Sequence, residues 1–201
     1  MWCYIYKYPF FPFISGIIIK IFVLAKIIID SKELEFKPGQ TILETAKDAG
    51  IKIPHFCWHP GLSISGNCRI CLVEIDKFPK LAIACSTLAV DGMIVYTKSE
   101  KVIKAQNAVM EFLLINHPLH CPICDEAGEC KLQDYAYKYG TGQSRFDEEK
   151  NHKDKRIPLG PNVMFDQERC ISCSRCIRCC EEIAKDPQLT FINRGEKVTI
   201  T

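Results

Sequence analysis

The stretch AKIIIDSKELEFKPGQTILETAKDAG, residues 25–50, decides the fold of the first half of the chain. The β-branched run AKIIID and the alternating KELEFK are typical of two strands, and the pair SK between them suits a tight hairpin turn. A helix is expected over residues 41–50, because Thr41 and Glu44 have the spacing of a capping box and Gly50 stands where a left-handed C-terminal residue belongs. The stretch therefore predicts a hairpin followed by a capped helix.

Three more strands are expected beyond this stretch, in residues 71–76, 81–86 and 93–97, each a short and largely apolar run. Together with the hairpin and the helix they predict a β-grasp arrangement, in which the sheet packs on the helix. We therefore assign residues 25–100 to the first domain of an α+β chain.

Two helices and a loop are expected to follow. Residues 99–116 have the apolar spacing of a helix, and we interpret one of its faces as core packing. The residues of this face are Val102, Ala105, Val109, Phe112 and Leu113. A shorter helix closed by Gly140 completes a small helical domain, residues 101–140. Residues 141–160 predict a surface loop with a solvated, charged face, and residues 161–201 predict the start of a ferredoxin-like domain that the chain does not complete.

Charge and cysteine content narrow the possible functions. The 201 residues include 26 basic and 24 acidic side chains, and this net charge of +2 gives no reason to expect nucleic acid or an anionic membrane surface as a partner. The 13 cysteines are the unusual feature. Their C-x-x-C spacing indicates metal sites that are built in a reducing compartment, not a disulfide framework.

Residues 1–24 form an apolar leader that is interrupted by Pro9, Pro12 and Lys20. Its apolar runs are shorter than the roughly 20 residues that a spanning helix needs, and no small-residue cleavage pattern follows it. We expect the leader to be a spurious extension of the functional protein. A membrane anchor and a secretory signal are the alternatives.

The first cysteine group consists of Cys57, Cys68, Cys71 and Cys85, with the spacing C-x10-C-x2-C-x13-C. A loop that carries the short pair, with a remote fourth cysteine on a strand, is typical of a 2Fe-2S cluster on the rim of a β-grasp sheet. A structural zinc site and plain buried cysteines are the alternatives. We predict a 2Fe-2S cluster.

The second group consists of His117, Cys121, Cys124 and Cys130. One imidazole and three thiolates can hold zinc, but beside an iron–sulfur domain we predict a 4Fe-4S cluster, whose negative charge a neutral imidazole reduces. His120 is the rival ligand. It adjoins Cys121 and would have to fold back tightly, whereas His117 at the end of the helix can reach across. We predict that His117 binds the cluster and that His120 faces solvent or supports the site.

The third group consists of Cys170, Cys173 and Cys176, which have the C-x2-C-x2-C spacing of a 4Fe-4S site. The next cysteine of such a run commonly serves another cluster, so the fourth ligand is expected from elsewhere. We favour a segment that follows residue 201, which makes the chain a fragment. The other candidates are Cys3, Cys179 and Cys180.

Three arginines stand between these ligands in the sequence, namely Arg69, Arg175 and Arg178. A positive charge near a cluster would lower the cost of its negative charge. A place on the solvated surface is the alternative for each of them.

Three motifs resemble, in their order, the N-terminal region of the large iron–sulfur subunit, called the G subunit, of respiratory NADH-quinone oxidoreductase, or complex I. The motifs are GNCRICLVE (66–74), HPLHCPICDEAGECKLQD (117–134) and ERCISCSRCIRCCEEIA (168–184). The resemblance runs from about residue 25 to the end of the chain. It implies the three ligand groups above, one 2Fe-2S cluster and two 4Fe-4S clusters, and in the family a later C-P-x-G-type segment completes the last cluster.

The resemblance also implies a function, that of an electron-transfer subunit which passes electrons from NADH and flavin on a partner subunit toward quinone. The partners would be the other peripheral-arm subunits of complex I. The location would be the cytoplasmic face of the bacterial inner membrane, or the equivalent matrix side, with the membrane contacted only indirectly. The sequence contains no G-x-G-x-x-G fingerprint and no catalytic acid–base pair, so we expect an enzyme subunit without a catalytic site of its own.

Other functions share part of this pattern. The same order of modules occurs in the diaphorase subunit of NAD-reducing hydrogenases and at the N-terminus of iron-only hydrogenases. A zinc-binding interaction protein, in which cysteine knuckles act as structural clips, is the alternative from a different class. Bound iron and sulfide distinguish the iron–sulfur functions from the zinc-binding one.

Overall fold

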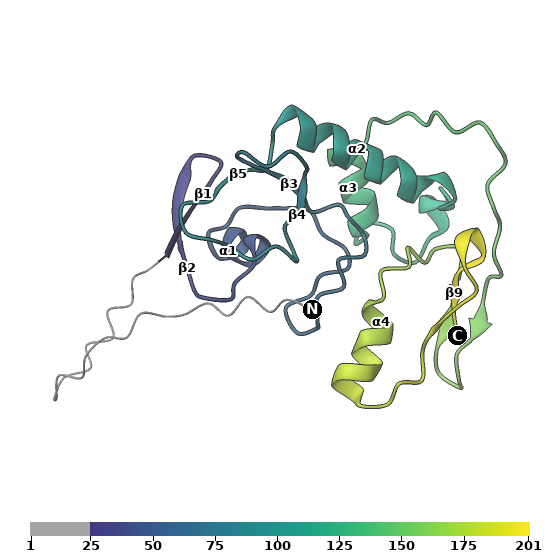
Figure 1. Ribbon diagram of the computed structural model, residues 1–201. Coiled ribbons are helices and arrows are strands. Elements are labelled where there is room, and N and C mark those ends of the chain that lie inside the picture. Colours follow the sequence, from purple (N-terminus) through teal and green to yellow (C-terminus); the bar gives the residue numbers. More distant parts are fainter. Residues whose placement is uncertain (1–24) are drawn as a thin grey trace, which may run out of the picture.

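The computed structural model describes residues 25–201, so the expectations for the leader and for Cys3 lie outside the described residues. The first part is a five-stranded mixed sheet with the strand order β2-β1-β5-β3-β4 (Figure 1). Its strands are β1 (Ala25–Ile29), β2 (Lys32–Phe36), β3 (Leu72–Ile75), β4 (Ala82–Ile83) and β5 (Ile94–Tyr96). Strand β1 is antiparallel to β2 and parallel to β5. The predicted hairpin and the predicted later strands are thus confirmed.

Helix α1 (Ile42–Asp48) packs on this sheet, and its first turn begins as the sequence predicts. The Thr41 hydroxyl accepts a hydrogen bond from the Glu44 amide at 3.3 Å, and the Glu44 carboxylate accepts one from the Thr41 amide at 2.8 Å. Gly50 follows the helix with a φ of +74°, the left-handed conformation expected of it. Ile42, Leu43 and Ala46 are buried against the sheet. The predicted β-grasp arrangement is confirmed.

A second core lies between the loop that precedes β3 and two helices, α2 (Glu100–Ile115) and α3 (Lys131–Tyr139). Its buried residues are Phe56, Ile70, Met110 and Leu132. Gly140 ends α3 by donating its amide to the Ala136 carbonyl at 2.9 Å. A Cβ on Gly140 would collide with that carbonyl oxygen, which explains why a glycine closes the helix.

The predicted buried face of α2 is wrong at Phe112, whose side chain is 75% exposed. The fully buried positions of the helix are Val102, Gln106 and Met110, one row of residues four apart. Gln106 is buried because its Nε2 group donates to the Leu72 carbonyl of β3 at 3.4 Å. This row is therefore the side of α2 that faces the sheet. Phe112 lies about 200° around the helix from Met110, on the other side of the helix.

The last third of the chain has short elements joined by long irregular segments. They are the hairpins β6 (Ile157–Pro158) with β7 (Met164–Phe165) and β8 (Phe191–Ile192) with β9 (Thr199–Ile200), and helix α4 (Arg175–Arg178), which continues as a π-helical turn, Cys179–Ala184. The predicted loop 141–160 ends earlier than expected, because β6 begins at Ile157.

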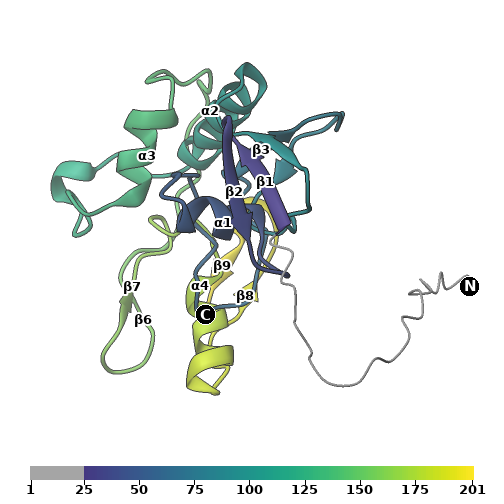
Figure 2. The same ribbon diagram turned by 90° about the vertical axis from the view of Figure 1, so that its left-hand side faces the viewer.

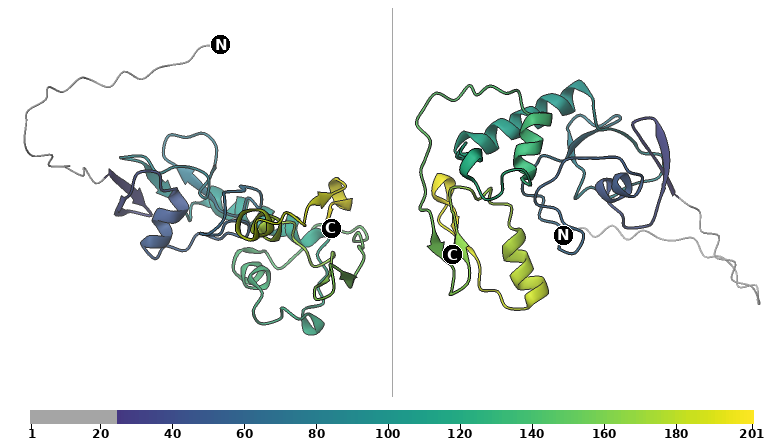
Figure 3. Two further views of the ribbon diagram at one scale, coloured as in Figure 1. Left: turned by 90° about the horizontal axis from the view of Figure 1, so that it is seen from below. Right: turned by 180° about the vertical axis from the view of Figure 1, so that it is seen from behind.

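The sheet and the C-terminal segment lie at opposite ends of the molecule (Figures 1 and 3). Seen from the sheet end, α2 and α3 lie above and α4 below (Figure 2). Single 3-10 turns at Cys121–Ile123 and Gly195–Lys197 complete the secondary structure. Within residues 25–201, no helix combines the length and the apolar character that crossing a bilayer requires.

Removing the N-cap of α1 should destabilise the first domain. Thr41→Ala deletes the oxygen that accepts from the Glu44 amide, in a side chain that is 1% exposed, so we expect the free energy of unfolding to fall by about 1 kcal/mol. Urea unfolding followed by circular dichroism measures the change. Thr41→Ser keeps the hydroxyl and is the control; an equal loss in both variants would contradict the capping role.

Candidate metal centres

The first cysteine group lies where the sheet meets the long loop before β3. Cys57 and Cys68 belong to the loop, Cys71 immediately precedes β3, and Cys85 follows β4 by two residues. The pairing of β3 with β4 brings the last two together, because the Ala84 amide donates to the Cys71 carbonyl at 3.0 Å. Cys57, Cys71 and Cys85 are buried, whereas Cys68 is half-buried.

The sulfur atoms of this group contact one another in pairs. The Cys57 amide donates to Sγ of Cys68 and the Cys68 amide donates to Sγ of Cys57, both at 3.5 Å. Thiol hydrogen bonds join Cys57 to Cys68 and to Cys85, and Cys71 to Cys85. These bonds lower the pKa of the accepting Cys57 and Cys71 and raise the pKa of the donating Cys68 and Cys85. Four cysteines linked by three side-chain contacts, with two amides aimed at their sulfurs, are a donor set that fits an iron–sulfur centre.

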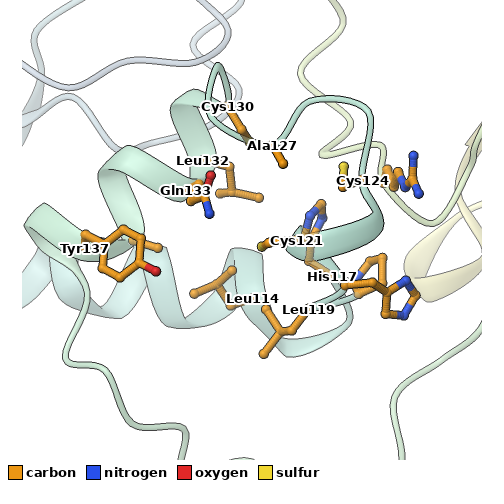
Figure 4. A pocket seen from close by; sticks show the side chains of 14 residues that line it. Leu114, His117, Leu119, Cys121, Cys124, Ala127, Cys130, Leu132, Gln133 and Tyr137 are labelled. Carbon is orange, nitrogen blue, oxygen red and sulfur yellow. The ribbon is translucent and has the colours of Figure 1, made fainter.

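The second group surrounds a pocket of about 180 Å³ beyond the end of α2 (Figure 4). His117, Cys121, Cys124 and Cys130 all line it, and so does the rival ligand His120. The rest of the wall is largely apolar, with Leu114, Leu119, Leu132 and Tyr137. Three thiols and an imidazole around one partly apolar pocket fit a cluster that is shielded from water. No three His, Cys, Asp or Glu side chains among residues 25–201 lie close enough together to chelate a single ion.

The imidazole of His117 is half-buried between two groups of cysteines. Burial disfavours its cation and lowers its pKa, and the charge of Lys150 acts in the same direction. A neutral imidazole is the form that binds metal. His117 also lines a smaller pocket of about 150 Å³ together with Cys170, whereas His120 is not part of that wall. His117 thus lies between the second and the third cysteine group.

Lys150 fixes the end of α2 next to His117. Its Nζ group donates to the carbonyls of Leu114, Ile115 and His117 at 2.7, 2.8 and 3.2 Å, which satisfies carbonyls that have no partner within the helix. Burial lowers the pKa of Lys150. Sequence reasoning missed this residue, because nothing in the charged run around it indicates which lysine reaches the helix.

Most charged residues of the loop are exposed, as predicted, and some of them also pair with charged residues elsewhere in the chain. Arg145 pairs with Glu111 of α2, with Nη2 2.6 Å from Oε2 and Nε 2.9 Å from Oε1. Glu168 is buried and accepts from Nδ1 of His152 at 2.7 Å, with Lys155 Nζ 2.5 Å away. Burial by itself raises the pKa of Glu168, but Lys155 and His152 together hold it at about 2. These pairs join the loop to α2 and to the segment just before the third cysteine group.

The third group begins in the irregular segment before α4. Ser172 and Ser174 have φ values of +53° and +62°, and the turn they make lets the Ser172 amide donate to Sγ of Cys170 at 3.3 Å. Burial raises the pKa of Cys170 and of Cys176. Cys173 lies between the two serines, and Cys180 lies in the π-helical turn that follows α4. An amide aimed at a cysteine sulfur fits the same chemistry as in the first group.

The loop of the first group is fastened to the third group. The Ser63 amide donates to the Glu182 carboxylate at 2.7 Å, and the Asn67 amide nitrogen donates to the Ser172 carbonyl at 2.7 Å. Arg178 reaches from α4 to the carbonyls of Ser63 and Cys57. Of the three arginines between ligands, Arg178 is buried and Arg69 is exposed. These contacts span more than 100 residues, so sequence spacing gave no sign of them.

Three family descriptions match the chain in succession. Residues 25–100 match a 2Fe-2S iron-sulfur cluster binding domain. Residues 106–145 match the NADH-ubiquinone oxidoreductase-G iron-sulfur binding region. Residues 160–201 match the ferredoxin-like domain of NADH-quinone oxidoreductase subunit 3.

Similar curated proteins are subunits of NADH-quinone or NADH-ubiquinone oxidoreductases. The G subunits of the NADH-quinone oxidoreductases of Rickettsia typhi and Rickettsia prowazekii are each 49% identical over 179 residues, 89% of this chain and 26% of the relative. The NADH-ubiquinone oxidoreductase 75 kDa subunit of Reclinomonas americana is 45% identical over the same shares. The chain thus spans about a quarter of the length of these curated relatives.

A solved structure has the same fold over most of its length. A chain in the crystal structure of an NAD+-reducing [NiFe]-hydrogenase in the H2-reduced state matches with a TM-score of 0.76 and 32% identity, covering 88% of this chain and 74% of that chain. The identity is higher to the Rickettsia relatives, and two of the three domain matches carry the oxidoreductase name. Over nearly all of the described residues, the chain is therefore similar to the iron–sulfur region of the G subunits of NADH-quinone oxidoreductases.

Proposed function

We propose that this chain is an electron-transfer subunit of a respiratory NADH-quinone oxidoreductase. It would pass electrons from NADH and flavin on a partner subunit toward quinone, within the peripheral arm and on the cytoplasmic or matrix side of the membrane. The observation that carries the proposal is the succession of three cysteine groups in a chain that is 49% identical to G subunits over 179 residues. Side-chain contacts link the cysteines of the first group, and the cysteines of the second line one pocket. Iron–sulfur centres bound there would exchange single electrons.

We assign the ligands of the first two centres as follows. Cys57, Cys68, Cys71 and Cys85 would hold a 2Fe-2S cluster, an assignment that the side-chain contacts among them support. A 4Fe-4S cluster would be held by His117, Cys121, Cys124 and Cys130. The wall of this site is largely apolar, and the neutral imidazole would leave the cluster less negative than four thiolates would.

A second 4Fe-4S cluster would be held by Cys170, Cys173 and Cys176. The donation from the Ser172 amide to Cys170 supports this assignment. We expect the fourth ligand from a segment outside this chain, since the chain covers only 26% of its relatives. Cys180, in the turn after α4, is the alternative within the described residues.

One observation favours a second candidate function, the diaphorase subunit of an NAD-reducing hydrogenase, because the solved structure with this fold comes from such an enzyme. The two functions differ in the enzyme that contains the chain. A complex purified from its native cells through a tag on this chain should reduce quinone with NADH. Hydrogen uptake coupled to NAD reduction in the same preparation would favour the hydrogenase.

Metal analysis tests the proposal directly. The chain purified without oxygen should be brown, should contain iron and acid-labile sulfide, and should give electron paramagnetic resonance signals after reduction. We expect about six iron atoms per chain if the first two centres fill, and about ten with the third. A colourless protein that contains zinc and no iron would support the zinc-binding interaction protein instead.

The choice between the two histidines is tested by a pair of variants. His117→Ala should alter or remove one 4Fe-4S signal, with the loss of about four iron atoms when the cluster is not retained, and should leave the 2Fe-2S spectrum intact. His120→Ala, in the wall of the same pocket, is the matched control and should leave both signals unchanged. The assignment is wrong if His120→Ala has the larger effect, or if His117→Ala removes both signals from a folded protein.

A further inference from the structure

Arg178 is a buried cation between two of the cysteine groups. It stands on α4 between Cys176 and Cys179, yet it is only 8% exposed. Its guanidinium reaches out of the third group, with Nη2 donating to the Cys57 carbonyl and Nη1 to the Ser63 carbonyl. The guanidinium therefore lies against the backbone of the loop that carries the first group.

The positive charge of Arg178 has no ion-pair partner within residues 25–201. All the acceptors of its hydrogen bonds are neutral: two carbonyls and the Ser174 hydroxyl, at 3.2 Å from Nε. The charge of Arg178 helps to lower the pKa of Glu182, but hydrogen bonds from Ser63 are the main cause, and Glu182 is partly exposed. A buried cation that is hydrogen-bonded only to neutral groups is costly unless a negative charge lies nearby.

We propose that Arg178 is the positioning residue that compensates the negative charge of the first iron–sulfur centre and raises its reduction potential. The inference rests on the proposed function, because a thiolate-bound iron–sulfur centre is negatively charged. Such a centre would supply the negative partner that Arg178 does not have among the ion pairs of residues 25–201. Reduction adds one more negative charge, so a nearby cation stabilises the reduced form more than the oxidised form. The effect is strong only where water does not screen it, and Arg178 meets this condition.

Arg69 offers a matched comparison for this role. It has the same charge and stands between Cys68 and Cys71, closer to predicted ligands in the sequence than Arg178 is, but it is exposed to solvent. Water should screen its charge from the cluster. The Ser63–Glu182 contact offers a second comparison, because it joins the same two segments without a buried cation.

The test is a redox titration of the chain, purified without oxygen, in which the 2Fe-2S signal is followed by electron paramagnetic resonance. Arg178→Gln should move the midpoint of this signal to lower potential, with iron and sulfide content unchanged. The shift should be several times that of Arg69→Gln. Equal shifts in the two variants, or an unchanged midpoint in a fully loaded Arg178→Gln protein, would overturn the proposal.

Two more variants separate charge from docking. Arg178→Lys keeps the cation and loses the forked hydrogen bonds, so the midpoint potential of its 2Fe-2S signal should stay closer to that of the unmodified chain. If the Arg178→Gln protein contains less iron than the unmodified chain, the midpoint of Arg178→Lys is the deciding measurement. Glu182→Gln weakens the docking contact and removes a negative charge, so it should not lower the midpoint. A midpoint in either variant as low as that of Arg178→Gln would overturn the proposal. An unmodified chain without iron would instead refute the proposed function.

Discussion

The structure depends on how one irregular loop is held. Residues 51–71 contain no helix or strand, yet they carry three of the four cysteines of the first group. The loop is fixed because the side chains on either side of Cys57 pack in opposite directions. Trp58 enters the core between the sheet and α1, and Phe56 enters the core of α2 and α3, where its ring lies 5.1 Å from that of Tyr135. Cys57 is thereby held between two cores.

This arrangement makes the first two cysteine groups parts of one body. The core of α2 and α3 also includes Ile70 and, at its edge, Cys68 and Cys130. Cys68 belongs to the first group and Cys130 to the second, so the same apolar contacts position a sulfur of each. Because protein interiors are close-packed and resist deformation, a shared core keeps two such sites at a constant separation. Constant separation is what electron exchange between fixed centres needs.

The C-terminal part is held in a different way. Beyond Leu132, the only fully buried apolar residue of the described chain is Ile200, so this part has no extensive core of its own. Polar contacts hold this part instead. Lys150 donates to carbonyls at the end of α2, Glu168 pairs with His152 and Lys155, and Arg178 donates to the Cys57 carbonyl in the loop 51–71. Such contacts need a precise geometry, and ligand bonds to metal would add to them, because metal binding and folding are coupled.

The sequence by itself determined the local structure and the division of the cysteines into groups. The hairpin, the Thr41 cap, the helix end at Gly140 and the three cysteine groups follow from spacing, since each depends on residues within one element or motif. Only the tertiary structure decided which side of α2 is buried, which lysine caps it and which arginine is removed from water. Phe112, Lys150 and Arg178 owe their places to partners far away in the chain, and periodicity within one segment carries no information about such partners.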